Sequence, residues 1–87
     1  MHIKDGFLLR EVAGNYVVMP LKSELNFGGL MTLNETGAFL WRLLEPGASR
    51  ETLLARMQEE YEVDGQTACR DLDVFLEKLR STGALHE

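Results

Sequence analysis

The sequence predicts an α+β fold in which a three-stranded antiparallel sheet is followed by three helices. Two patterns indicate this. Residues 7–33 fall into short apolar runs separated by Gly, Asn and Pro, which is typical of strands and turns. From Asn34 onward, apolar residues recur at intervals of three and four, the period of helices with one buried face. The change of period therefore places the sheet before the helices.

The first two strands are expected at Phe7–Val12 and Tyr16–Met19. Between them, Ala13-Gly14-Asn15 predicts a short turn at Gly-Asn, because these residues tolerate the backbone conformations of tight hairpins. A third, shorter strand is expected at Leu30–Leu33, after a pair of glycines that can bend or bulge the backbone.

The first helix is expected to begin after Asn34, whose side chain can accept an N–H of the first helical turn. Thr32 with Glu35 offers an alternative capping box, so two starting points stay open. Pro46-Gly47 ends this helix. Gly37 falls on its apolar stripe, which indicates that another element packs closely there.

Ser49 is expected to cap the second helix, and either Asp64 or Thr67 the third and longest one. Gly83 is well placed to end the third helix, and Leu85 to fold back onto its last turn. Three strands followed by three helices, the last two joined by a tight turn, is the content of a winged-helix-like arrangement with the sheet first.

Length and composition exclude several classes of protein. A chain of 87 residues predicts a single domain, residues 1–87, with an economical core. One cysteine cannot form an internal disulfide, so a reducing, cytoplasmic setting fits best. No signal peptide or membrane span is recognisable, and we expect a soluble protein with no membrane partner. The net charge of −5 opposes binding to nucleic-acid phosphates.

Residues that usually perform catalysis or hold a metal are sparse. His2 and His86 lie at the two ends, where chains are usually mobile. Cys69 has no histidine near it in sequence and falls beside an apolar stripe. Asp71 and Asp73 are two residues apart, and such positions on a helix do not face each other. We therefore expect no catalytic residue, metal or cofactor, and a protein that is not an enzyme.

The predicted third strand offers a different kind of site. A short edge strand leaves unpaired N–H and C=O groups, to which an extended peptide can add itself without any catalytic residue. On the third helix Asp71, Val74 and Lys78 form a band that is either an ordinary amphipathic boundary or a recognition surface. Phe39 lies off the apolar stripe of the first helix, so it packs under the sheet or contributes to an apolar surface.

Four segments together carry a resemblance to a known family. They are Phe7–Gly14, the phrase Leu33-Asn34-Glu35-Thr36-Gly37-Ala38-Phe39-Leu40-Trp41, the turn Tyr61–Asp64, and the ending Asp71-x-x-x-Phe75-Leu76-x-x-Leu79 with Gly83 and Leu85. With these segments the chain resembles the PqqD family over nearly its whole length. The resemblance implies a winged-helix-like precursor-peptide recognition element. Such a module binds the leader of a ribosomally synthesised peptide and presents it to a modifying enzyme, often a radical S-adenosylmethionine maturase.

In that family the leader is held as an added strand against the third strand, in the cleft beside the third helix. Carried over by position, the resemblance implies a peptide-binding site on one strand edge and one helix face. Its residues are Leu30, Met31, Thr32, Leu33, Asp71, Val74, Phe75 and Lys78. The charged pair on the helix is placed to set the register of the leader by meeting complementary charges.

We therefore predict a non-catalytic adaptor, or peptide chaperone, of natural product biosynthesis. Two alternatives stay open: a winged-helix nucleic-acid-binding or regulatory module, and a structural module that forms homodimers through the same strand edge. The charges of the third helix argue against groove binding, since three basic residues are offset by three acidic ones: Arg70, Lys78 and Arg80 against Asp71, Asp73 and Glu77. The sequence identifies neither the leader nor the partner enzyme.

Overall fold

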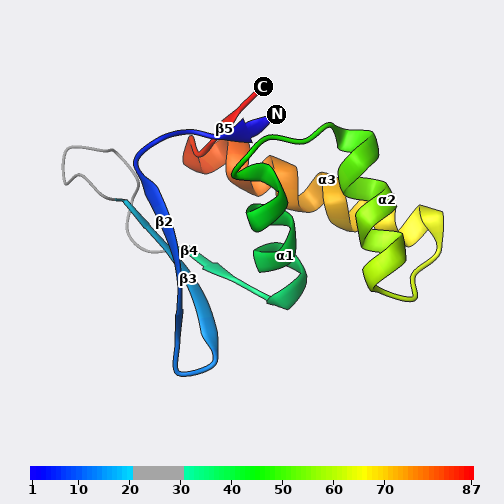
Figure 1. Cartoon of the computed structure of the whole chain (residues 1–87), viewed down its shortest axis with the longest axis horizontal. Coiled ribbons are helices and arrows are strands. Elements are labelled where there is room, and N and C mark those ends of the chain that lie inside the picture. Colours follow the sequence, from blue (N-terminus) through cyan, green and yellow to red (C-terminus); the bar gives the residue numbers. More distant parts are fainter. Residues whose placement is uncertain (21–30) are drawn as a thin grey trace.

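The computed structural model describes residues 1–20 and 31–87, and within them the α+β fold is confirmed (Figure 1). Three antiparallel strands form one sheet in the order β2-β3-β4. Their bounds are β2 Phe7–Val12, β3 Asn15–Pro20 and β4 Met31–Leu33. Because β3 is central, β2 and β4 form the two edges of this sheet. The expected third strand therefore exists at Met31–Leu33, while Leu30 lies outside the described residues.

The hairpin between β2 and β3 turns on two residues. Val12 pairs with Asn15, which leaves Ala13 and Gly14 in the turn with φ values of 52° and 83°. The predicted turn at Gly-Asn is wrong by one position, because Asn15 begins β3. Positive φ at both central residues matches the right-handed twist of the two strands. Ala13 thus occupies a left-handed conformation that its Cβ disfavours.

Three helices follow the sheet, as predicted, and each begins after a side chain that accepts an N–H three residues later. The capping oxygens are Asn34 Oδ1, Ser49 Oγ and Asp64 Oδ1, at 2.7, 3.1 and 2.7 Å from their donors. The two open boundaries are thereby decided in favour of Asn34 and Asp64. The helices are α1 Glu35–Leu44, α2 Arg50–Glu60 and α3 Gly65–Thr82. Gly83, with φ 80°, ends α3 as expected.

The core lies between the inner face of the sheet and the helices. Trp41 of α1 is fully buried at its centre, with the edge-on ring of Phe7 at 6.5 Å between centroids. Val18 on the central strand is also fully buried. Phe39 does not lie under the sheet; it packs edge-on against Tyr61, which follows α2, at 5.6 Å. The helical stripes predicted from the sequence therefore bury the faces expected of them, and Phe39 packs against the end of α2.

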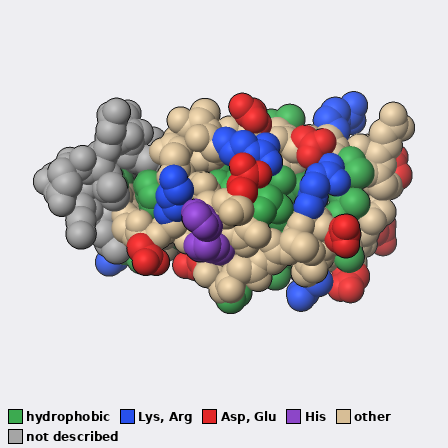
Figure 2. Space-filling view, turned by 90° about the horizontal axis from the view of Figure 1, so that it is seen from above, with side chains coloured by type: hydrophobic (Ala, Val, Ile, Leu, Met, Phe, Trp, Pro, Cys, Tyr) green, Lys and Arg blue, Asp and Glu red, His purple; other side chains and the backbone are tan. Residues whose placement is uncertain are grey.

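A second, two-stranded sheet joins the ends of the described chain. In β1 (His2–Ile3) and β5 (Leu85–His86), Ile3 faces Leu85 and both are buried, while the rings of His2 and His86 lie 4.6 Å apart. Figure 2 shows the two histidines side by side at the surface. The expectation that the two histidines lie on mobile chain ends is corrected, because both belong to paired strands. The sequence did not show these strands, since two residues are too few to show a period.

None of the helices in the described part of the chain is long and apolar enough to cross a membrane.

We expect Ala13→Asn to stabilise the protein by about 1 kcal/mol, since Asn tolerates the left-handed conformation and Asn-Gly suits this turn. Ala13→Val is the matched control and should destabilise, because a β-branched residue is strained at positive φ. Urea unfolding of the three proteins measures both effects. A Val variant as stable as the wild type would contradict the turn geometry.

Candidate functional site

A cleft of about 320 Å³ opens between the end of β4, the first turns of α1 and the middle of α3. Both walls belong to elements that the sequence singled out, the third strand and the third helix. The residues that line it are Leu33, Asn34, Thr36, Gly37, Leu40, Asp71, Val74, Phe75 and Lys78.

The α3 wall is a single face of the helix, since its residues recur at intervals of three and four. Val74 is 65% exposed and is one of two large hydrophobic residues that the structure describes as exposed. Phe75 beside it is buried and belongs to the core. Asp71 and Lys78 lie one turn before and one turn after Val74. The exposed part of this wall is thus the apolar side chain of Val74, with the carboxylate of Asp71 on one side and the ammonium of Lys78 on the other.

The β4 wall presents main-chain groups as well as side chains. Lys78 Nζ donates to the carbonyl oxygen of Thr32 at 2.9 Å, so this oxygen lies on the strand edge that faces α3. In an antiparallel pair, successive residues direct both main-chain groups to opposite edges. The N–H of Thr32 therefore lies on the open edge, which no other strand of the described residues covers, while those of Met31 and Leu33 face β3.

A tight corner between β4 and α1 shapes the floor of the cleft. The backbone N–H of Gly37 donates to Asn34 Oδ1 at 2.7 Å. A Cβ on Gly37 would approach that oxygen to 3.2 Å and the Cβ of Leu33 to 3.3 Å. The expectation that another element packs closely at Gly37 is confirmed, because only a hydrogen atom leaves this approach unhindered.

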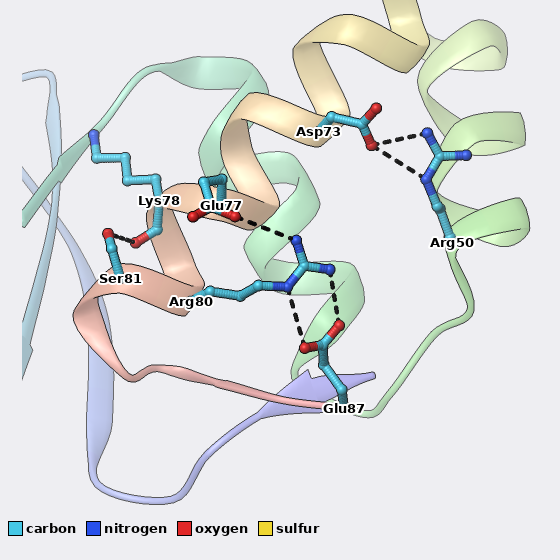
Figure 3. Close-up of polar contacts among 7 residues, drawn as sticks. All are labelled: Arg50, Asp73, Glu77, Lys78, Arg80, Ser81 and Glu87. Carbon is cyan, nitrogen blue, oxygen red and sulfur yellow. Dashed lines mark hydrogen bonds and ion pairs between the residues drawn. The ribbon is translucent and has the colours of Figure 1, made fainter.

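Most charges on the other side of α3 are neutralised within the fold (Figure 3). Arg50 of α2 reaches Asp73 at 2.8 Å, and Arg80 reaches Glu87 at 2.8 Å and Glu77 at 3.7 Å. The hydrogen bond that Arg80 donates to Glu87 lowers the pKa of Glu87, and the hydrogen bond that Arg50 donates to Asp73 raises the pKa of Arg50. Arg80, one of the three basic residues that the sequence places on α3, is therefore not a free cation.

The cleft side of α3 differs. Among residues 1–20 and 31–87, neither Asp71 nor Lys78 takes part in an ion pair. Both residues are exposed, and within the described ranges the Lys78 ammonium donates to a neutral carbonyl, that of Thr32. In Figure 3 the Lys78 side chain extends toward the strand, away from the paired groups. Two opposite charges at the cleft therefore remain without an ionic partner in the described part of the chain.

The structure brings together five of the eight residues that the resemblance singled out, namely Leu33, Asp71, Val74, Phe75 and Lys78. Met31 and Thr32 lie next to the cleft on β4, but Met31 is buried and its main-chain groups face β3. Leu30 lies outside the described residues.

The sequence interpretation missed the α1 side of the cleft. Thr36, Gly37 and Leu40 line it together with Asn34. Their spacing of three and four already placed them on one face of the helix, but it did not show that this face turns toward α3.

The histidines and the cysteine lie away from this cleft. In the described ranges, no three His, Cys, Asp or Glu side chains come close enough together to hold a metal ion. Cys69 is half-buried on α3.

The family model described as coenzyme PQQ synthesis protein D (PqqD) matches residues 15–85. The chain belongs to the PqqD family. The resemblance seen in the sequence is thereby confirmed, and the match includes both walls of the cleft.

Two solved structures of similar proteins have the same fold as this PqqD family member. One is described as TbiB1 in complex with the TbiA(beta) leader peptide; it is 30% identical, with a TM-score of 0.80, over 99% of this chain and 95% of that one. The other, a lasso peptide synthetase B1 complexed with the leader peptide, is 22% identical, with a TM-score of 0.77, over 99% and 96%. No curated protein matches the chain.

We expect α3 to be less stable in acid, because its N-cap residue, Asp64, carries a titratable carboxylate. Hydrogen bonds from Thr67 hold the pKa of Asp64 below its ordinary value. A depressed pKa contributes stability above the unfolded value of about 4, which is lost as the pH falls through the folded value. Asp64→Asn keeps an equally good cap that does not titrate.

We therefore expect the wild type to lose stability relative to Asp64→Asn as the pH is lowered from neutral to about 3. Urea unfolding of both proteins across this range measures the difference. A constant difference in unfolding free energy would show that the Asp64 carboxylate does not contribute to α3 in this way.

Proposed function

We propose that this chain is a non-catalytic peptide-binding adaptor, or peptide chaperone. It holds the leader of a ribosomally synthesised precursor as an added strand on β4 and presents it to a modifying enzyme, such as a radical S-adenosylmethionine maturase. The observation that carries the proposal is the open edge of β4 beside an exposed Val74 in one cleft. Membership of the PqqD family and the likeness to TbiB1 with its leader peptide support it.

Strand addition accounts for both walls of the cleft. An incoming strand can bond to the N–H and C=O of Thr32, which supply affinity that does not depend on sequence. Its alternate side chains then cover Val74 and contact the apolar atoms of Leu33, Leu40 and Phe75. Covering an exposed Val from water supplies the apolar part of the affinity.

The side chains lining the cleft suit binding better than catalysis. Among the described residues that line it, Asp71 and Lys78 are the ionisable ones, and the others are apolar or are the amide, hydroxyl and glycine of Asn34, Thr36 and Gly37. Since these described residues include no nucleophile–base pair, we assign the chemistry on the precursor to the partner enzyme. We propose a single recognition domain, residues 1–87, without metal or cofactor, acting in the reducing cytoplasm.

The two alternatives receive less support. A nucleic-acid reader on α3 would need several free cations on one face, but Arg80 is held by Glu77 and Glu87, and Lys78 shares its face with the carboxylate of Asp71. Figure 2 shows acidic and basic side chains interspersed on the visible face. Pairing of two copies through β4 would use the same edge as the leader, so it is an outcome that the tests below detect.

The direct test is titration with synthetic leader peptides from short reading frames beside the gene for this chain, followed by amide shifts. We expect perturbation at Thr32, Val74 and Phe75. Binding that leaves these amides unperturbed would place the site elsewhere. Mass measurement at several concentrations detects a homodimer, and salt-dependent binding to duplex DNA would favour the nucleic-acid module.

We expect Val74→Asp to weaken leader binding at least about tenfold, because it removes the apolar contact and introduces a desolvated charge. The matched control is Val12→Asp, since Val12 is 53% exposed at the hairpin tip, away from the cleft. Both variants should keep the thermal midpoint of the wild type. Calorimetric titration that finds equal losses in the two variants would count against the cleft.

We expect Thr32→Pro to weaken binding by about three- to tenfold, since one main-chain hydrogen bond contributes roughly 0.5–1.5 kcal/mol. Proline is tolerated on an edge strand when the lost N–H points outward. Thr32→Val keeps the N–H and should bind normally. Equal affinities of the Pro and Val variants, with circular dichroism confirming the fold, would exclude strand addition at this residue.

A further inference from the structure

We propose that the cleft selects its peptide by the order of charges along it. The preferred segment carries a basic side chain, an apolar side chain two residues later and an acidic side chain two residues after that. This inference rests on the proposed function and specifies its ligand. It follows from the unpaired charges at the cleft, their spacing on α3 and the direction of β4.

Two opposite charges at the cleft are available to a ligand. Asp73, Glu77 and Arg80 on α3 are occupied by ion pairs with each other or with Arg50 and Glu87. Asp71 and Lys78 have no such partner among the described residues, and both line the cleft. A bound peptide therefore meets one free carboxylate and one ammonium.

The spacing of these two charges matches that of alternate side chains in an extended peptide. Asp71 and Lys78 are seven residues apart on one face of α3, which corresponds to about 10.5 Å along the helix. Val74 lies between them. In an extended strand, side chains on one face recur every second residue, and four residues span roughly 13 Å. The difference between these two lengths is within the reach of Lys, Arg or Glu side chains. Peptide residues i, i+2 and i+4 therefore match Asp71, Val74 and Lys78.

The direction of β4 sets the order in which a peptide meets the two charges. The Lys78–Thr32 contact fixes the C-terminal part of α3 beside the middle of β4. Beyond Thr32 the chain runs toward α1 along the N-terminal half of α3, so β4 and α3 run in opposite directions (Figures 1 and 3). Both described pairings in the sheet are antiparallel. A peptide that pairs antiparallel with β4 therefore runs in the same direction as α3. It passes Asp71 first and Lys78 last, which sets the order basic, then acidic.

The Lys78 hydrogen bond also explains why the acidic residue matters. The Thr32 carbonyl that Lys78 occupies is the group that an incoming strand N–H needs. When the strand takes this carbonyl, the ammonium is released. A carboxylate on the peptide then accepts from the ammonium in a charge-assisted hydrogen bond, which is stronger than the bond it replaces. A peptide without that carboxylate displaces Lys78 without this compensation.

The test is selection from an mRNA-displayed library of random peptides on the wild-type protein and on the double variant Asp71→Lys/Lys78→Glu. The exchange keeps the net charge and changes two exposed residues. We expect the wild type to enrich basic-x-apolar-x-acidic segments and the variant to enrich the reverse order. In calorimetric titration, exchanging the two peptide charges should weaken wild-type binding about fivefold, as expected for two exposed pairs.

The matched control is Arg56→Glu/Glu59→Arg, which exchanges an exposed ion pair on α2 outside the cleft and should select like the wild type. Thermal midpoints establish that both double variants fold. Two outcomes would overturn this inference: enriched peptides without a charge order, and the same charge order in the wild type and the Asp71/Lys78 variant. In both cases the proposed peptide-binding function would still hold. Reverse order in the wild type would overturn the inference too, through parallel addition. Absence of any enriched peptide would count against the proposed function itself.

Discussion

The geometry of the cleft depends on one hydrogen bond, from the Gly37 N–H to Asn34 Oδ1 at 2.7 Å. This bond begins α1 immediately after β4, so the chain turns from strand to helix within one residue. The close approach of Leu33 is accommodated because Gly37 has no Cβ, which would lie 3.3 Å from the Cβ of Leu33. With this corner in place, Met31 and Leu33 point into the core, and Thr32 keeps its main-chain groups on the open edge. The cleft follows from the local capping of α1.

The second constraint is the division of α3 into two faces. Ion pairs with Arg50 and Glu87 tie one side of the helix to α2 and to the chain end after β5. Exposed pairs of this kind contribute little stability individually. Their consequence is to neutralise Asp73, Glu77 and Arg80, which do not line the cleft. Among the described residues that line the cleft, the charges left for a ligand are those of Asp71 and Lys78, on either side of Val74.

Much of the fold was predictable from the sequence because its signals are local. The three helices and their ends follow from apolar period, capping residues and Gly83. Where two local signals competed, as at Asp64 and Thr67, the sequence could not choose, since both residue types cap helices. The pairing of Ile3 with Leu85 was not predictable, because it joins residues at opposite ends of the chain and each strand is too short to show alternation.

The candidate site divides in the same way. By itself the sequence determined that an apolar residue stands between two opposite charges on one helix face, because helical spacing alone places Asp71, Val74 and Lys78 together. Only the tertiary structure decided that this face meets the edge of β4, that Met31 faces inward, and that Asp71 and Lys78 have no ionic partners in the described residues. These facts depend on the direction in which α1 leaves β4 and on contacts between residues distant in the chain, such as Lys78 and Thr32. No local pattern encodes them.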